Sequence, residues 1–115
     1  MKRITMLAAV VTAAAFAANA GAATPKLVAS VSDPVNISLK MGTKKVTSLP
    51  AGKYTIVVKD LAADHNFHLK GPGLNKTTSV AGKGTFTWTV TLKKGTYTYV
   101  CDPHASFMKG SVKVT

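Results

Sequence analysis

The run Thr85-Phe86-Thr87-Trp88-Thr89-Val90-Thr91-Leu92 alternates a threonine with a large apolar residue at every step. Successive side chains of a β-strand point to opposite faces of a sheet. This period of two therefore places the four apolar residues on a buried face and the four threonines on a solvated one. The run predicts a strand with one side packed against a hydrophobic core.

Short β-branched segments on both sides of this run predict further strands, and each is bounded by Gly or Pro turn signals. The predicted strands are 26–32, 35–40, 53–59, 96–101 and 111–115, and the turns are Asp33-Pro34, Pro50-Ala51-Gly52, Gly71-Pro72-Gly73 and Lys93-Lys94-Gly95. Seven or eight short strands at this spacing indicate an all-β fold, an antiparallel Greek-key β-sandwich. The stretch 60–64 is expected to hold a helical turn and no more.

Length and charge restrict the class of protein. The chain has 115 residues, which is enough for one domain, and it has 15 Lys or Arg against four acids. Its single cysteine excludes an internal disulfide. Thirteen Lys and no Arg follow residue 22, so bidentate reading of bases or phosphates is not expected and nucleic acid is excluded as a partner. Most of these lysines are expected to solubilise the surface, and their charge would steer the protein toward an acidic redox partner.

The first 22 residues have the three parts of a secretory signal peptide. Lys2 and Arg3 precede an apolar run at 6–18, and two A-x-A cleavage sites follow at 18–20 and 20–22. The apolar run is shorter than the roughly 20 residues that a membrane span needs, so no stable membrane insertion is expected. The sequence thus predicts a signal peptide at 1–22, one domain at 23–115, and a periplasmic or extracellular location.

The soft metal ligands gather in two short segments. All three histidines, the only cysteine and one of the two methionines after residue 22 lie within 64–68 and 101–108. A thiolate, imidazoles and a thioether form the donor set of electron-transfer copper sites, with a His₂Cys plane and a weak axial Met. Because Cys101 ends a strand, the loop after it can curl back so that His104 and Met108 approach the same point. The first segment, with His65 and His68, then supplies one more imidazole.

At these residues the chain resembles a cupredoxin of the plastocyanin, pseudoazurin and amicyanin type, in a small secreted bacterial form. The resemblance covers about 35–115 and rests on the segment His-Asn-Phe-His-Leu-x-Gly-Pro-Gly at 65–73 and on the run that leads from Leu92 to Cys101. It implies one mononuclear type 1 copper, and a first Tyr of that run, Tyr97, that braces a corner. The implied ligands are His65, Cys101, His104 and Met108. Three residues separate His104 from Met108, where plastocyanins have four and amicyanins two, so the axial bond length and the redox potential stay open.

Each assignment has a simpler alternative. Cys101 could be a buried small residue or the partner of an intermolecular disulfide, and Met108 could belong to the core. His68 lies three residues from His65 on an extended chain and points to the opposite side, so Asn66 and His68 are expected to support the ligands rather than bind the metal. The neighbouring carboxylates are expected to stay off the copper.

The predicted function is a monomeric type 1 copper protein that carries single electrons between redox partners and is not an enzyme. By the resemblance to cupredoxins, the electron would leave through the edge of His104. It would cross an apolar patch, ringed by lysine, to which Pro72, Leu74, Ala105 and Phe107 contribute. The alternative is a copper-binding module for storage, delivery or sensing that transfers no electrons. A third hypothesis, an immunoglobulin-like adhesion domain, predicts no colour with copper.

Overall fold

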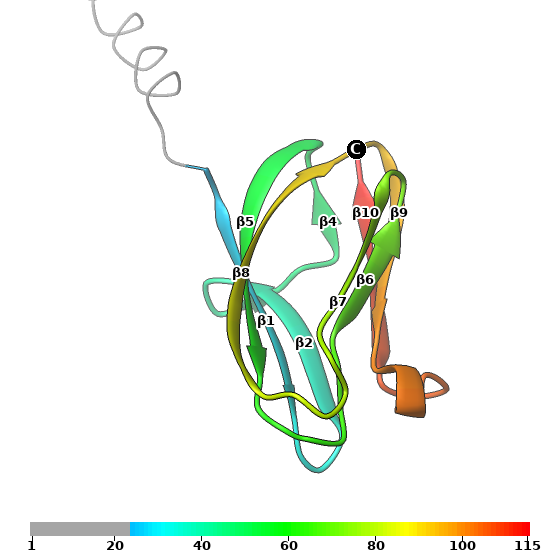
Figure 1. Cartoon of the computed structure of the whole chain (residues 1–115). Coiled ribbons are helices and arrows are strands. Elements are labelled where there is room, and N and C mark those ends of the chain that lie inside the picture. Colours follow the sequence, from blue (N-terminus) through cyan, green and yellow to red (C-terminus); the bar gives the residue numbers. More distant parts are fainter. Residues whose placement is uncertain (1–23) are drawn as a thin grey trace, which may run out of the picture.

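The computed structural model describes residues 24–115, which form two five-stranded sheets packed face to face (Figure 1). Sheet A has the order β3-β2-β1-β5-β8 and sheet B the order β4-β10-β9-β6-β7. The strands are β1 (Lys26–Ser32), β2 (Asn36–Met41), β3 (Lys44–Lys45), β4 (Ser48–Leu49), β5 (Gly52–Asp60), β6 (His68–Gly71), β7 (Leu74–Thr77), β8 (Gly84–Leu92), β9 (Gly95–Val100) and β10 (Lys109–Val114). The predicted β-sandwich is confirmed, whereas the predicted signal peptide at 1–22 lies outside the described residues.

Two strand pairs differ from the antiparallel pairing that we expected. The pairs β1–β5 and β10–β4 are parallel, and the other six pairs among the described residues are antiparallel. The reason is a crossover: after β3 the chain leaves sheet A, adds β4 to the edge of sheet B, and returns as β5 from the end at which β1 also begins. Two strands that enter a sheet from the same end must lie parallel.

The strand positions agree closely with the prediction, and the differences are local. The sequence missed the hairpin of β6 and β7 and the two-residue strands β3 and β4. The stretch 60–64 holds only a turn at its end, and the one short helix of the described part is the 3-10 turn η2 (Asp102–His104). No helix among residues 24–115 is both long and apolar enough to cross a membrane.

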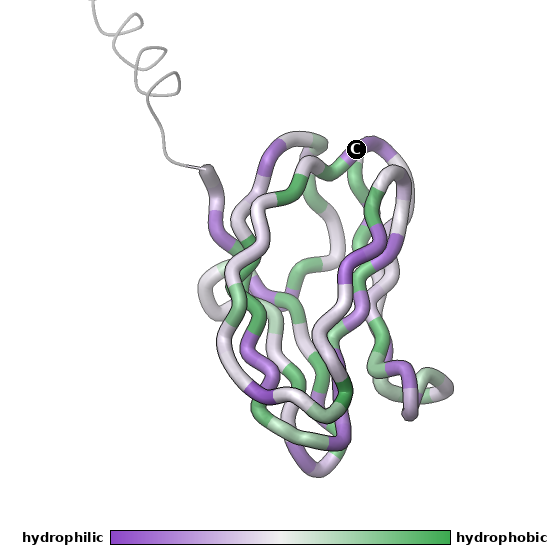
Figure 2. Tube along the Cα trace, in the orientation of Figure 1, coloured by the Kyte–Doolittle hydropathy of each residue, from purple (hydrophilic) through white to green (hydrophobic). Residues whose placement is uncertain are grey.

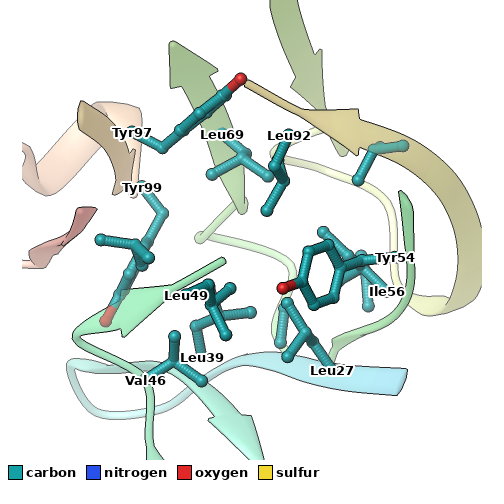
Figure 3. Close-up of a cluster of buried hydrophobic side chains, with 14 of the residues drawn as sticks. Leu27, Leu39, Val46, Leu49, Tyr54, Ile56, Leu69, Leu92, Tyr97 and Tyr99 are labelled. Carbon is teal, nitrogen blue, oxygen red and sulfur yellow. The ribbon is translucent and has the colours of Figure 1, made fainter. Parts of the chain in front are cut away.

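The core lies between the sheets and follows the period of two. Green and pale or purple residues alternate along the strands in Figure 2, and the inward residues form one cluster that Figure 3 shows in part. Val90 and Leu92 are buried as predicted, but Phe86 is 43% exposed. Phe86 lies at the open edge of sheet A, where it lines a surface hollow with Trp88, Thr77 and Ser79 instead of packing beneath sheet B. Alternation predicts the face of a residue, but not whether another layer covers that face.

Tyr97 braces the corner between the two strands that precede the metal-binding loop, which confirms the prediction. Its hydroxyl donates to the carbonyl of Pro72 over 2.7 Å and accepts from the N–H of Lys93 over 2.9 Å. Its ring lies flat on Gly71, leaving no room there for a Cβ atom. This packing fixes the position of β6 against β9, and thereby aligns the two segments that carry the soft ligands.

We expect Gly71→Ala to destabilise the protein by about 2–3 kcal/mol, since the added methyl group overlaps the ring of Tyr97 and forces strand β6 to move. For a domain of this size the melting temperature should fall by about 10 °C or more. Calorimetry of the variant measures this loss. Gly82→Ala is the matched control, because a Cβ at Gly82 meets only ordinary van der Waals contacts. Equal melting temperatures for the two variants would contradict the corner packing.

Candidate metal centre

The loop after β9 folds back on itself at one end of the sandwich. Cys101 directly follows β9 and precedes η2. Its backbone N–H donates to the carbonyl of Met108 over 3.0 Å, and the N–H groups of His104 and Met108 donate to the carbonyls of Cys101 and His104 over 2.9 and 2.8 Å. These hydrogen bonds hold the three residues beside one another, as the curled loop of the prediction required.

His65 reaches the same place from the loop between β5 and β6. Its Nδ1 lies 3.2 Å from Nδ1 of His104 and 3.5 Å from Sγ of Cys101, and the Cys101 Sγ lies 3.4 Å from Nδ1 of His104. A point equidistant from these three atoms is about 2 Å from each, close to the length of a bond between a first-row metal and imidazole. The three donors therefore surround a space of the size that one metal ion needs.

The orientation of the His65 ring is fixed by a backbone carbonyl. Nε2 of His65 lies 2.9 Å from the carbonyl oxygen of Pro34, which can only accept a hydrogen bond. The proton of a neutral ring therefore resides on Nε2, and Nδ1 presents its lone pair to Cys101 and His104. The sequence of Asp33-Pro34 indicates only a turn and does not reveal this contact. The exposed Asp33 and Asp64 carboxylates also approach Nε2, at 3.2 and 3.8 Å.

The two imidazole rings differ in how deeply they are buried. His65 and Cys101 are fully buried, whereas His104 is partly exposed at the surface of the same loop. The rings of His65 and His104 meet edge to face with centroids 4.8 Å apart, and the Phe107 ring lies 5.6 Å from that of His104. One edge of the centre thus reaches the surface through His104, while the rest is closed by protein.

Asn66 ties the two ligand-bearing segments together. Its side-chain N–H group donates to Thr77 Oγ1 over 2.9 Å and to the Asp102 carboxylate over 2.8 Å, and its carbonyl accepts the backbone N–H of Asp102 over 2.7 Å. The residues next to His65 and next to Cys101 are therefore linked in both directions. The prediction that Asn66 supports the ligands agrees with this network.

His68 points away from the three donors. Its Nδ1 lies 3.0 Å from both oxygens of the Asp102 carboxylate, and its Nε2 lies 2.6 Å from Oδ1 of Asn75. Burial alone would raise the pKa of Asp102, but the hydrogen bonds from Asn66 and His68 and the charges of His68 and Lys70 outweigh it and lower that pKa. Asp102 therefore stays ionised as the acceptor that both residues share, beside the centre rather than in it.

Met108 is buried, with 1% of its surface exposed, and its backbone bonds to both Cys101 and His104. Its place as the axial ligand remains a prediction from the sequence. Among the described residues, the group formed by His65, Cys101 and His104 is the one that combines a thiol with imidazoles.

The surface around this end differs from the expected one. Ala105 and Phe107 lie in the loop of His104, but Pro72 bonds to Tyr97, about 13 Å along β9 from Cys101, and Leu74 is paired with Gly71 at that remote end. The large exposed apolar residues of the loops at the metal end are instead Phe107, Leu61, Val35 and Val80.

The charges around the metal end are mixed. All four acids of the chain lie in the turns and strand ends there, namely Asp33, Asp60, Asp64 and Asp102. Lys83 is the one lysine in the loops at that end of the described chain, and the flanking strands add Lys59, Lys70, Lys76 and Lys109. The ring of lysines around His104 stays a prediction from the sequence.

The protein is a β-sandwich, and at one end it carries a buried Cys whose sulfur lies within 3.5 Å of two imidazole nitrogens. This combination defines a mononuclear copper protein of the cupredoxin class. The sequence from residue 28 to 115 matches the model for copper binding proteins of the plastocyanin/azurin family. The chain belongs to this family, and its cofactor is one type 1 copper.

Solved structures of rusticyanin have the same fold. Rusticyanin from Thiobacillus ferrooxidans is 21% identical, with a TM-score of 0.57, and the match covers 78% of this chain and 76% of that one. Reduced rusticyanin is 24% identical with a TM-score of 0.59, over 80% and 77% of the two chains. No curated protein matches the sequence.

Proposed function

We propose that this protein carries single electrons between redox partners outside the cytoplasm, with copper bound by His65, Cys101, His104 and Met108. The observation that carries the proposal is the triangle of two imidazole nitrogens and one thiol sulfur, each 3.2–3.5 Å from the next. Copper in such a site supplies a one-electron couple between Cu(I) and Cu(II). The chain supplies the geometry of the donors and the access to them.

Rigid positioning of the donors supports an electron carrier. The Pro34 carbonyl orients His65, the loop hydrogen bonds hold Cys101, and Asn66 joins the two segments. Donors that are held in this way need to move little between two oxidation states, and the barrier to electron exchange is then small. The partly exposed His104 beside the exposed Phe107 provides a route to the surface.

The partner and the location belong to the same proposal. The apolar residues Phe107, Leu61 and Val35 suit brief docking at the metal end. An acidic redox partner rests on the net charge of the chain, because aspartates and lysines are mixed at the metal end. The export of the protein is inferred from the sequence of residues 1–22. The proposal also includes that the protein is a monomer and that it is not an enzyme. Two surface hollows of the described part of the chain, over Thr98 and beside Trp88, are not lined by donor residues.

Voltammetry beside a copper competition separates an electron carrier from a copper store. We expect the copper-loaded protein to give a reversible one-electron couple and to release Cu(I) slowly to a strong Cu(I) chelator, because the thiol is fully buried. A storage or delivery protein should instead lose its copper rapidly and show no reversible couple. That second result would replace the proposal with the copper-binding module of the alternative hypothesis.

A further inference from the structure

The outer face of sheet A carries five lysines that the copper centre does not use. They are Lys26, Lys40, Lys45, Lys53 and Lys59, and all five are exposed. Each alternates along its strand with buried residues that face the core, so each side chain points outward. Residues that are paired on neighbouring strands point to the same face of a sheet. Lys40 is paired with Val28 on one side and with Lys45 on the other. Lys53 and Lys59 are paired with Thr91 and Thr85, so the outward face continues across the whole sheet.

This outer face contains no acid. The positions between its lysines are mostly threonine and serine, and the four aspartates of the chain lie at the metal end. Every ion pair within residues 24–115 joins a histidine to an aspartate, so these lysines have no carboxylate partner there. The lysines lie on four neighbouring strands, β3, β2, β1 and β5, and adjacent strands are about 4.8 Å apart, within the Debye length of about 10 Å at 0.1 M salt. Lysines on adjacent strands therefore act together.

The charges of Lys40 and Lys45 repel each other and lower the stability of the sheet. The two residues are directly opposite each other on neighbouring antiparallel strands, and side chains opposite each other share a face. Like charges in this arrangement destabilise a sheet. A bound anion would remove the repulsion, which makes the pair the centre of a site for negative charge.

The chemistry of the face distinguishes among anionic partners. It lacks Arg and lacks aromatic side chains, so it offers neither bidentate contacts to phosphate nor stacking for bases. It also lacks the buried aromatic anchors of a tight protein interface, because its apolar members are the half-buried Val28 and Val57. Lysines on a broad, open surface match a plane of anionic lipid headgroups, which needs charge but no pockets.

We propose that the outer face of sheet A adsorbs to the surface of a membrane that contains anionic phospholipids, without insertion. The strands then lie along the bilayer. The loops at the metal end lie beyond the ends of the strands (Figure 1), so His104 stays open to a partner in the same membrane plane. This adsorption does not depend on electron transfer.

The experiment measures binding of the purified protein to vesicles of phosphatidylcholine with and without phosphatidylglycerol, by sedimentation at low and at physiological salt. The wild type is expected to bind only the anionic vesicles, with affinity falling as salt rises. The triple variant Lys40→Gln, Lys45→Gln, Lys59→Gln should bind about a hundredfold more weakly, because each lysine beside an anionic surface contributes roughly fivefold.

Matched variants test the face and the orientation. Lys70→Gln, Lys109→Gln, Lys113→Gln removes the same charge from the outer face of sheet B and should change binding little. Phe107→Ser, at the metal end, should bind like the wild type. Equal losses in the two triple variants would show attraction by net charge alone and overturn the proposal. So would absence of binding to the anionic vesicles at low salt, or binding to soluble polyglutamate in place of vesicles.

Discussion

Replacing Cys101 by serine is expected to abolish the intense visible band that Cu(II) gives with the wild-type protein. The band arises from charge transfer between a thiolate and copper, and Cys101 is the only cysteine of the chain. A serine hydroxyl is a hard donor that stays protonated near neutral pH, so it cannot replace the thiolate. The copper affinity should fall by more than the 10–100-fold that is typical for loss of a residue that only supports a ligand.

A titration with Cu(II) followed by visible absorption measures both quantities. The wild type should saturate at one copper per chain, and Ser106→Ala, in the same loop but exposed, is the matched control that should keep the band. A serine variant that retains the band would show that the thiol is not a ligand. A colourless wild-type protein would favour the adhesion or storage hypotheses.

Replacing His65 by alanine should have the second-largest effect, and it separates the two neighbouring histidines. His65 contributes one corner of the donor triangle, so His65→Ala should lose the blue site or recover it only when imidazole is added to fill the space. His68→Ala removes contacts to Asp102 and Asn75 but no donor of the triangle. It should keep the spectrum, with a loss of copper affinity of about 10–100-fold at most.

The two variants act as controls for each other, because each removes one imidazole from the same segment. The measurements are the visible spectrum at saturating copper, with and without added imidazole, and the melting temperature without copper. A lost band in His68→Ala together with an intact band in His65→Ala would overturn the ligand assignment.

Much of the fold was predictable because strands show their faces in the sequence. Strand β1 has the predicted bounds, and β2, β5, β8, β9 and β10 each differ by one or two residues. Phe86 is the instructive error. Its alternation with threonine is correct, but coverage of an edge strand depends on how far the opposing sheet extends, which no local pattern contains. The parallel pairing of β1 with β5 was missed for the same reason, because it follows from the path of a crossover.

By itself, the sequence determined the kinds of donor at the centre and grouped them in two segments, since soft ligands are rare and their spacing is visible in a short stretch. Only the tertiary structure decided which of their atoms meet. The nearness of His65 to Cys101, 36 residues away, depends on the packing of β6 against β9, and the choice of its Nδ1 depends on the carbonyl of Pro34.

The charges of the chain show the same division. Thirteen lysines and four aspartates after residue 22 can be counted in the sequence, but the gathering of all four aspartates at the metal end and of five lysines on one sheet face cannot. Aspartates that are far apart along the chain gather because turns at one end of a sandwich come together in space. Lysines on four different strands share one surface because register and strand order align them. Composition fixes the net charge, and the fold alone fixes where that charge acts.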